Sequence, residues 1–417
     1  MNHLNHYITR KAGEIYLNLI ALIGTVKPFE NKGDEAIYIT SIQLIRKHLK
    51  KIKILLASPE FNPSYRKLRK YGADIITRHP MGALSELLTK RNTPNSFQKS
   101  LAKYIYYHTP PLISALLSKR IPSKFNKILK NIDTFVIASH PLEAAGFSTY
   151  VSSFVIPRFL NPQSKIIAFP LSLSTKILNN FISKSRAKNA LNKANIVYTR
   201  GNHTAKLLKK HLKLKNVVAS FDPAITLSKT EPKEKPLKGI AVVPAGLSVN
   251  PLFLAKLIRK LIEELEKHIY IIPFSLDDIP IAHKLFNLVK NKDSCNVIDT
   301  SNMSPQELKG FLSHVEMLIT SRVHAAIFAL SEHIPTIGIL REDDVKFYDV
   351  LGTFKLDEYI FNPKIAPINT LNKIISTAKA ITDNRSDIVQ LIKQKLPLAV
   401  AKAENTCFAL KKLVTGD

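Results

Sequence analysis

The sequence predicts an α/β protein made of two Rossmann-like domains that face each other across a cleft, followed by a C-terminal helix. Strand-like and helix-like segments alternate along most of the 417 residues, which is typical of βαβ units and mainly parallel sheets. The chain is also longer than one hydrophobic core usually serves. Because the Pro- and charge-rich stretch Thr226–Lys238 is typical of a linker, we expect domains over residues 1–225 and 226–417.

The N-terminal half contains six short apolar runs that we interpret as strands. They are Ile15–Gly24, Ile52–Ser58, Thr134–Ser139, Lys165–Pro170, Ile196–Thr199 and Val217–Ser220. Helical patterns between them are Asp34–Leu49, Asn62–Tyr71 and Thr204–Leu212. The basic stretch Leu84–Lys130 is predicted to be a helical insertion.

The C-terminal half repeats this alternation. The predicted strands are Gly239–Ala245, Ile269–Phe274, Asn296–Asp299, Val315–Thr320 and Pro335–Leu340, and the predicted helices are Pro251–Lys267, Pro280–Asn291, Pro305–Ser313 and Ala325–Leu330. Ser304 to Glu307 form a capping box with proline at the first helical position, which is a fairly specific helix start. Residues 385–414 form a long terminal helical pattern.

Positive charge is concentrated in the N-terminal half of a chain whose formal net charge is +29. Between Leu87 and Phe221 there are 22 Lys and Arg residues but two acids, Asp133 and Glu143. Such a surface suits a polyanion, for example anionic lipid headgroups, lipid pyrophosphate or a nucleotide. A lysine-rich, merely solvated surface explains the charge equally well. Nucleic acid is an unlikely partner because no known nucleic-acid-binding motif is present.

Cysteine content and hydropathy indicate the compartment. Cys295 and Cys407 are too few for a disulfide framework or a cysteine-based metal site. The sequence shows no metal-ligand spacing, and neither a metal nor another cofactor is expected. No apolar run approaches the roughly 18 residues of a membrane-spanning helix, and a signal-peptide layout is lacking. We expect a cytoplasmic protein, with its basic half peripheral on the inner membrane face.

The pentapeptide Ser321–Ala325, Ser-Arg-Val-His-Ala, carries the strongest chemical signal. It follows the apolar run Val315–Thr320 and precedes a helical pattern. Open α/β sheets bind ligands where a parallel strand leads into a helix, and the helix N-terminus favours an anion. Arg322 would clamp a carboxylate or phosphate, and His324 would transfer a proton. These five residues alone are explained better by a surface arginine beside a core histidine.

A second motif, Asn31-Lys32-Gly33-Asp34-Glu35, follows the first predicted strand. Gly33 permits a tight turn and the close approach of a ligand to the backbone. Asp34 and Glu35 stand at a helix start, where the helix dipole favours carboxylates. A capping role for Asp34 is therefore slightly favoured over ligand binding.

Taken together, the ordered motifs resemble the polysaccharide pyruvyl transferase family. The matching segments are Asn31–Ala36, Tyr198–Arg200, Asp222–Ala224, Ser321–Ala325, Ile334–Ile337 and Lys346 with Leu351-Gly352. The resemblance implies a fold like that of the two-domain glycosyltransferases of the B type (GT-B). It also implies that pyruvate passes from phosphoenolpyruvate, a co-substrate, to two hydroxyls of a cell-surface polysaccharide or its precursor as a cyclic ketal.

The resemblance further implies roles for single residues. Arg200 and Arg322 would hold the phosphate and carboxylate of phosphoenolpyruvate, Val323 would add a backbone contact, and His324 would act as general acid or base. An exposed arginine at a helix start explains Arg200 equally well. Further residues expected along the cleft or at the acceptor site are Asn31, Gly33, Asp34, Glu35 and Lys346. Lys346 is interpreted as solvated or phosphate-steering.

Two turns of the N-terminal half depart from the family pattern. A single late glycine, Gly146, follows the strand at Thr134–Ser139 where the family has a Gly-rich turn, and the expected Gly-Pro-type turn after Lys165–Pro170 is missing. Because this half is expected to face the acceptor, either the acceptor sugar differs from the usual ones or the activity has changed.

Two other functions stay open. A GT-B glycosyltransferase would use Arg322 and Lys346 to stabilise the leaving diphosphate of a nucleotide sugar. A non-catalytic relative would bind polyanions through its basic face, although the joint presence of Arg200, Arg322 and His324 opposes this. In the enzyme hypothesis, the basic half would dock on the membrane, where a lipid-linked acceptor would be presented.

Overall fold

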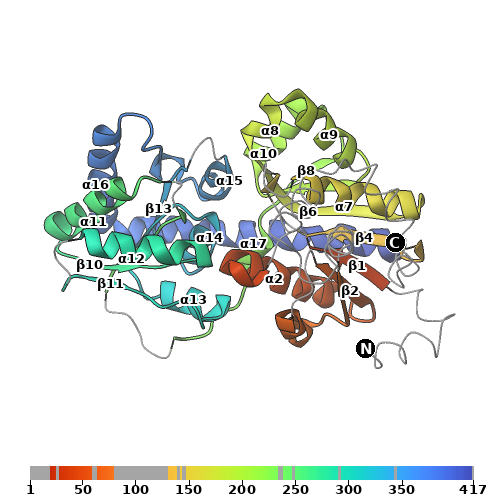
Figure 1. Cartoon of the computed structure of the whole chain (residues 1–417), viewed down its shortest axis with the longest axis horizontal. Coiled ribbons are helices and arrows are strands. Elements are labelled where there is room, and N and C mark those ends of the chain that lie inside the picture. Colours follow the sequence, from red (N-terminus) through yellow and green to blue (C-terminus); the bar gives the residue numbers. More distant parts are fainter. Residues whose placement is uncertain are drawn as a thin grey trace, which may run out of the picture.

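The structure, a computed structural model, describes residues 19–24, 28–58, 63–78, 130–138, 141–142, 147–232, 238–246, 249–289, 293–341 and 345–415. The predicted insertion Leu84–Lys130 lies outside the described residues except for Lys130 itself. Two parallel sheets flanked by helices lie side by side (Figure 1), one from each half of the chain. The predicted α/β class with two Rossmann-like domains is confirmed.

The N-terminal domain is built on the first sheet. Its strands are β1 (Leu19–Ile23), β2 (Lys53–Ser58), β3 (Ile75–Arg78), β4 (Thr134–Ile137), β5 (Pro141–Leu142), β6 (Lys165–Leu173), β7 (Ile196–Thr199) and β8 (Val217–Ala219). Seven of them follow the order β3-β2-β1-β4-β6-β7-β8, and β5 pairs with β6. The helices are η1 (Pro28–Glu30), α2 (Lys32–His48), η2 (Pro63–Tyr71), α7 (Phe147–Leu160), α8 (Thr175–Asn179), α9 (Phe181–Leu191), α10 (Asn202–Leu207), η3 (Leu208–Leu212) and η4 (Pro223–Thr226).

The two atypical turns of this domain meet in β6. This strand was predicted to end at Pro170, but it continues to Leu173 and pairs there with β5. Its pairing with β7 shifts register between Ala168 and Leu171. Pro170 lies within that shift and has no N–H to donate to a ladder, so an irregularity there is physically expected. A continuation of strand β6 therefore takes the place of the Gly-Pro-type turn that the family pattern predicts.

The C-terminal domain is built on the second sheet, with strand order β11-β10-β9-β12-β13-β14. The strands are β9 (Gly239–Val243), β10 (His268–Ile271), β11 (Cys295–Val297), β12 (Met317–Thr320), β13 (Thr336–Ile339) and β14 (Ile360–Phe361). The helices are α11 (Pro251–Leu265), η6 (Leu276–Asp278), α12 (Ile279–Leu288), α13 (Pro305–Leu312), α14 (Val323–Ser331), α15 (Lys346–Thr353), η7 (Asp357–Tyr359), α16 (Pro367–Asp383) and α17 (Arg385–Thr415). The predicted capping box opens α13: Glu307 N donates to Ser304 Oγ, and Ser304 N donates to Glu307 Oε2.

Helix α17 ties the two domains together. Figure 1 shows it extending from the second sheet across to the first. Ser220 Oγ, which follows β8, donates to the carbonyl of Lys402 at 2.6 Å, and Lys165 Nζ on β6 donates to the carbonyl of Leu413. No helix among the described residues is long and apolar enough to cross a membrane.

The hydrophobic core follows the alternation of side chains along the first sheet. Ile20 and Leu22 of β1 pack into a core that continues through the C-terminal domain. Leu19, Ala21 and Ile23 belong to a second core on the opposite face. Because successive strand residues point to opposite faces, a single strand joins the interdomain core to the core of its own domain.

A second interdomain tie lies at the start of α10. Asp349 of α15 accepts hydrogen bonds from Thr204 N, at 3.0 Å, and from Thr204 Oγ1. A Cβ at Gly201 would lie 2.6 Å from Asp349 Oδ1, so the close approach requires glycine there. Next to this contact, His203 stacks on Tyr348 with ring centroids 5.6 Å apart. A carboxylate of one domain therefore caps a helix of the other.

We predict that Thr204→Val lowers the free energy of unfolding by about 1–3 kcal/mol, because the buried Asp349 carboxylate loses its hydroxyl partner. Urea unfolding would measure the change. The matched control is Thr382→Val in α16, whose hydroxyl bonds to the carbonyl of Ala378 in the same helix. Equal losses in the two variants would contradict an interdomain role for Thr204.

Candidate active site

The predicted site residues lie where the two domains meet. Strand β1 leads through η1 into α2, and the first turn of α2 touches the C-terminal domain. Lys32 N donates to the carbonyl of Phe274 at 3.0 Å, and Asn31 forms an antiparallel bridge with Ser275. Helix α14 begins directly after β12 and contacts both α2 and η4. Two strand-to-helix turns, one from each sheet, therefore face one another.

Asn31, rather than Asp34, is the N-cap of α2. Asn31 Oδ1 accepts from Gly33 N at 2.8 Å and from Asp34 N at 3.4 Å. The capping role favoured for Asp34 is therefore wrong, because the helix begins two residues earlier than predicted. Asn and Asp are both favoured N-cap residues, each accepting from N–H groups two or three residues further along the chain. Since Asn31 does so, the Asp34 carboxylate is left to the interdomain junction.

Gly33 packs directly against the imidazole of His324. A Cβ at position 33 would lie 2.1 Å from His324 Nδ1 and 2.3 Å from His324 Cγ, far inside van der Waals contact. The absence of a side chain at Gly33 thus makes room for the ring of His324. This contact brings together the two motifs that the sequence singled out.

Arg322 is held in place by a buried carboxylate. Its Nε donates to Asp278 Oδ2 at 3.0 Å and its Nη2 donates to Asp278 Oδ1 at 2.5 Å, a bidentate arrangement. Asp278 also accepts from the backbone N–H groups of Gly246, Phe274 and Ser275. Within the described residues, no hydrogen bond of Arg322 uses Nη1. The guanidinium is thus fixed and keeps donor capacity.

Arg200 is a buried residue, 1% exposed, so the interpretation as an exposed helix-start arginine is wrong. Its Nε lies 2.7 Å from Asp222 Oδ2. The same carboxylate oxygen lies 3.5 Å from His324 Nε2. Burial by itself would raise the pKa of Asp222, but the charge of Arg200 and the adjacent His324 outweigh it and hold this pKa below its ordinary value.

Asp222 is the residue whose role sequence reasoning missed. It belongs to the matching Asp-Pro-Ala segment, yet nothing in its local pattern distinguishes it from a turn residue, and its side chain does accept from Ala224 N. Its position between Arg200 and His324 depends on the packing of α14 against η4. The one available signal was its place within the ordered set of motifs.

Asp34 is influenced electrostatically by three basic side chains and by the imidazole of His324. Burial raises the pKa of its carboxyl, and the charges of His324, Arg200, Arg322 and Lys346 oppose that rise. The predicted residues Asp34, Arg200, Arg322, His324 and Lys346 thus converge on one region. Such a concentration of buried positive charge around one carboxylate suits an anionic ligand.

Lys346 opens α15 and is 5% exposed, so a solvated role is excluded. Burial lowers the pKa of its ammonium group to about 8, and the charge of Asp34 partly opposes that change. A lysine with this pKa is mostly protonated at neutral pH and loses its charge as the pH rises above about 8.

Glu35 does not join this cluster. Burial raises the pKa of its carboxyl, and the charges that oppose this are those of Lys32, Lys67 and Lys70. Val323 is the buried first residue of α14. No side chain of the described residues caps this helix, so its first-turn N–H groups suit an anion.

Two polar atoms beside α14 are buried without a hydrogen bond among the described residues: Ser321 Oγ and His324 Nε2. Because buried polar groups are normally paired, both are candidates to bind a ligand. The described residues contain no group of three His, Cys, Asp or Glu side chains that could bind a metal ion.

We predict that Gly33→Ala destabilises the protein by about 1–3 kcal/mol, because the new methyl overlaps the His324 ring. Elsewhere in a helix the same change usually stabilises, by about 0.5–1 kcal/mol. Thermal and urea unfolding would give the sign. The double variant Gly33→Ala/His324→Ala should recover stability because the clash partner is gone. A destabilisation that persists in the double variant would contradict the contact.

Several solved structures superpose on most of this chain. The chain superposes on Staphylococcus aureus MnaA in complex with UDP with a TM-score of 0.60 and 11% identity, covering 95% of this chain and 96% of the other. For Neisseria meningitidis UDP-GlcNAc 2-epimerase bound to UDP-GlcNAc, the values are 0.58, 10%, 96% and 100%. For a glycosyltransferase from Rickettsia africae, they are 0.52, 12%, 95% and 98%. At these identities the likeness shows a GT-B-like fold alone.

The sequence comparisons are more specific. A search of curated proteins gave no match. The family model described as polysaccharide pyruvyl transferase matches residues 31–343, which is most of the chain. This match begins at the Asn31 motif and contains Arg200, Asp222, Arg322 and His324. The chain therefore belongs to the polysaccharide pyruvyl transferase family.

Proposed function

We propose that this protein transfers the pyruvyl group of phosphoenolpyruvate to two hydroxyls of a polysaccharide or its precursor and forms a cyclic ketal. The observation that carries the proposal is the junction where Gly33 packs on His324 and where Arg200, Arg322 and Lys346 act electrostatically on Asp34. An imidazole, a carboxyl of raised pKa and a fixed guanidinium stand together there. This set supports proton transfer on an anionic substrate.

In this proposal the donor is bound mainly by Arg322 and Lys346. Phosphoenolpyruvate carries a carboxylate and a phosphate, and a planar guanidinium suits either group. Arg322 is fixed by Asp278 and retains Nη1, while Lys346 adds a second charge. The start of α14, with Val323, adds N–H donors. Arg200 adds its charge and fixes Asp222, since its Nε already pairs with that carboxylate.

In this chemistry, His324 transfers a proton in two separate steps. His324 Nε2, near the Asp222 carboxylate, donates a proton to C3 of phosphoenolpyruvate, and C2 gains oxocarbenium character. The first sugar oxygen bonds to C2 and its hydroxyl releases a proton to Asp34. Asp34 passes this proton to phosphate as phosphate leaves C2, the second sugar oxygen bonds there, and His324 takes the second hydroxyl proton. One hydroxyl proton ends in the new methyl group and the other leaves with phosphate.

We expect calorimetry to detect phosphoenolpyruvate binding that weakens about 10–100-fold in Arg322→Lys, since a charge-assisted hydrogen bond contributes roughly 1.5–3 kcal/mol. Lysine retains the charge and loses the bidentate geometry. Arg69→Lys, at an exposed position of η2, is the matched control and should bind as the wild type does.

The same titration separates the competing functions. UDP binding without phosphoenolpyruvate binding would favour a nucleotide-sugar glycosyltransferase, as would UDP binding that depends on Arg322. Binding of neither ligand, with or without a saccharide acceptor present, would contradict a pyruvyl transfer role and favour a non-catalytic relative.

A pH titration of phosphoenolpyruvate affinity tests Lys346. The pKa of Lys346 is lowered to about 8, so the side chain is charged below this pH and neutral above it. Affinity should therefore fall as the pH rises through about 8. In Lys346→Gln this step should vanish, and in the control Lys364→Gln, an exposed lysine, it should remain. An unchanged step in Lys346→Gln would contradict its contact with the donor.

A further inference from the structure

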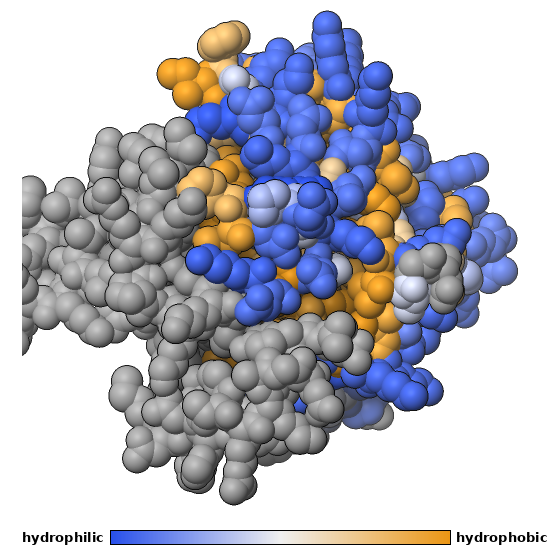
Figure 2. Space-filling view, turned by 90° about the vertical axis from the view of Figure 1, so that its right-hand side faces the viewer, coloured by the Kyte–Doolittle hydropathy of each residue, from blue (hydrophilic) through white to orange (hydrophobic). Residues whose placement is uncertain are grey.

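The outer part of the N-terminal domain carries positive charge without any acid. Between Phe147 and Phe221 the sequence has 13 Lys and Arg residues and no Asp or Glu. Lysines of α10, η3 and the segment after them are exposed: Lys206, Lys209, Lys210, Lys213 and Lys215. Figure 2 shows hydrophilic side chains covering much of the upper part of this domain, where Figure 1 places α8 and α9. This surface therefore attracts anions.

Two large apolar side chains project beside these lysines. Phe181 is 85% exposed and Ile182 is 67% exposed, and they are the first two residues of α9. The helix start is fixed, because Asn180 Oδ1 accepts from Ser183 N at 2.9 Å. An adjacent Phe-Ile pair this exposed gains free energy when it leaves water.

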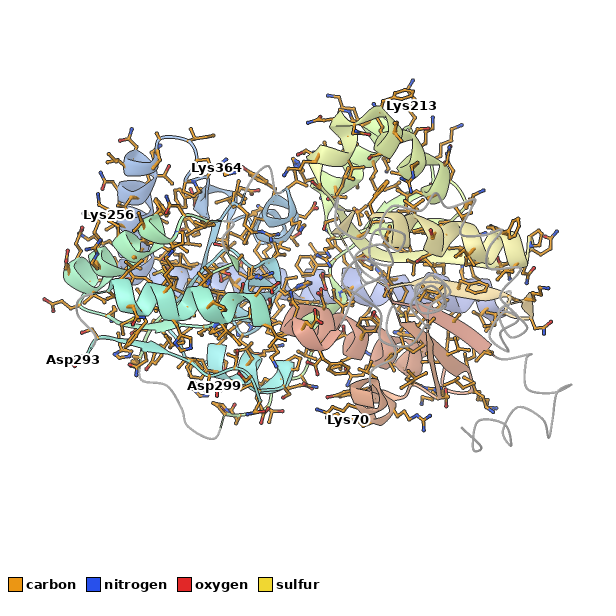
Figure 3. All side chains as sticks on the ribbon, viewed as in Figure 1. Lys70, Lys213, Lys256, Asp293, Asp299 and Lys364 are labelled. Carbon is orange, nitrogen blue, oxygen red and sulfur yellow. The ribbon has the colours of Figure 1, made fainter. Side chains whose placement is uncertain are left out.

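The pair and the lysines lie on neighbouring helical segments of the domain. Helix α9 packs against η3, which carries Lys209 and Lys210. Figure 3 shows Lys213 on the outer surface of this domain. Amphipathic cationic and apolar groups in this arrangement are typical of surfaces that lie on anionic membranes.

The apolar pair lies toward the carboxyl edge of the first sheet, the edge that also leads into the site. Strands β6 and β7 are parallel. The carboxyl end of β6 leads through α8 to Phe181, and the carboxyl end of β7 leads to Arg200. A partner surface bound through Phe181 would therefore lie near the carboxyl edge of the sheet, the edge where β7 leads to Arg200.

We propose that Phe181 and Ile182, together with Lys206, Lys209, Lys210 and Lys213, form a docking surface for an anionic lipid bilayer. The lysines bind headgroup phosphates, and Phe181 and Ile182 enter the boundary between headgroups and acyl chains. A soluble polyanion would pair with the lysines but leave the apolar pair in water. The proposal rests on the proposed function in one respect: the acceptor sugar would be carried on lipid and presented from the membrane.

Vesicle flotation tests the apolar pair. Wild-type protein should float with vesicles of phosphatidylcholine and phosphatidylglycerol, and much less with phosphatidylcholine alone. Phe181→Ser/Ile182→Ser should partition into the mixed vesicles roughly tenfold less, as expected for losing buried apolar area. Ile365→Ser/Ile368→Ser, which changes residues 69% and 68% exposed in the other domain, is the matched control and should bind like wild type.

The lysines need their own matched pair of variants. Lys209→Gln/Lys210→Gln/Lys213→Gln should lose mixed-vesicle binding by roughly a hundredfold, at about 1 kcal/mol for each of the three lysines near the surface. The control carries the same number of changes in the C-terminal domain. It replaces Lys256, Lys364 and Lys373, all exposed, with Gln. Figure 3 shows Lys256 and Lys364 on that domain, away from Lys213.

Three results would overturn the proposal. The first is a wild type with no preference for anionic vesicles, and the second is an equal loss of binding in the test and control variants. The third is a wild type that binds dextran sulfate but not vesicles, with dextran sulfate binding unchanged in Phe181→Ser/Ile182→Ser. Phosphoenolpyruvate titration of each variant keeps the two proposals separate. Docking variants that bind phosphoenolpyruvate normally but not vesicles support the docking surface. Vesicle binding by a wild type that never binds phosphoenolpyruvate would overturn the proposed function alone.

Discussion

The contact between Gly33 and the His324 ring is the constraint on which the site depends. It fixes the start of α2, from one domain, against the start of α14, from the other. The approach is possible because position 33 has no side chain, and Asn31 rather than Asp34 caps α2. Asp34 is then brought among Arg200, Arg322, His324 and Lys346. A shift of one domain against the other would break the contact between Gly33 and His324.

Buried ion pairs hold the remaining groups in position. Asp278 fixes Arg322, and Asp222 lies between Arg200 and His324. Removing one partner of such a pair leaves an uncompensated buried charge, so these residues stabilise the geometry as a set. The two arginines therefore differ in their contacts. Arg322 retains donor capacity for a ligand, whereas Arg200 pairs through its Nε with the Asp222 carboxylate. The interdomain hydrogen bonds of Asp349 and α17 hold the two domains, and with them the two halves of the site, in a fixed relative position.

Local patterns predicted much of the fold. Apolar runs located β9, β12 and most of β6, and the Ser304–Glu307 capping box marked the start of α13. The misses have physical causes. Asn31 and Asp34 can both accept helix N–H groups, so sequence could not choose between them. The end of β6 depended on pairing with β5, a contact between segments that are distant in sequence.

The sequence by itself determined the alternating α/β class, the strand-to-helix position of Arg322 and His324, and the concentration of positive charge in the N-terminal half. These properties follow from periodicity, capping and composition, which are local. Only the tertiary structure decided that Gly33 touches His324, that Asp222 links Arg200 to His324, and that Phe181 lies exposed toward the carboxyl edge of the sheet that leads to Arg200. Each of these depends on the packing of segments far apart in the chain, which no local pattern encodes.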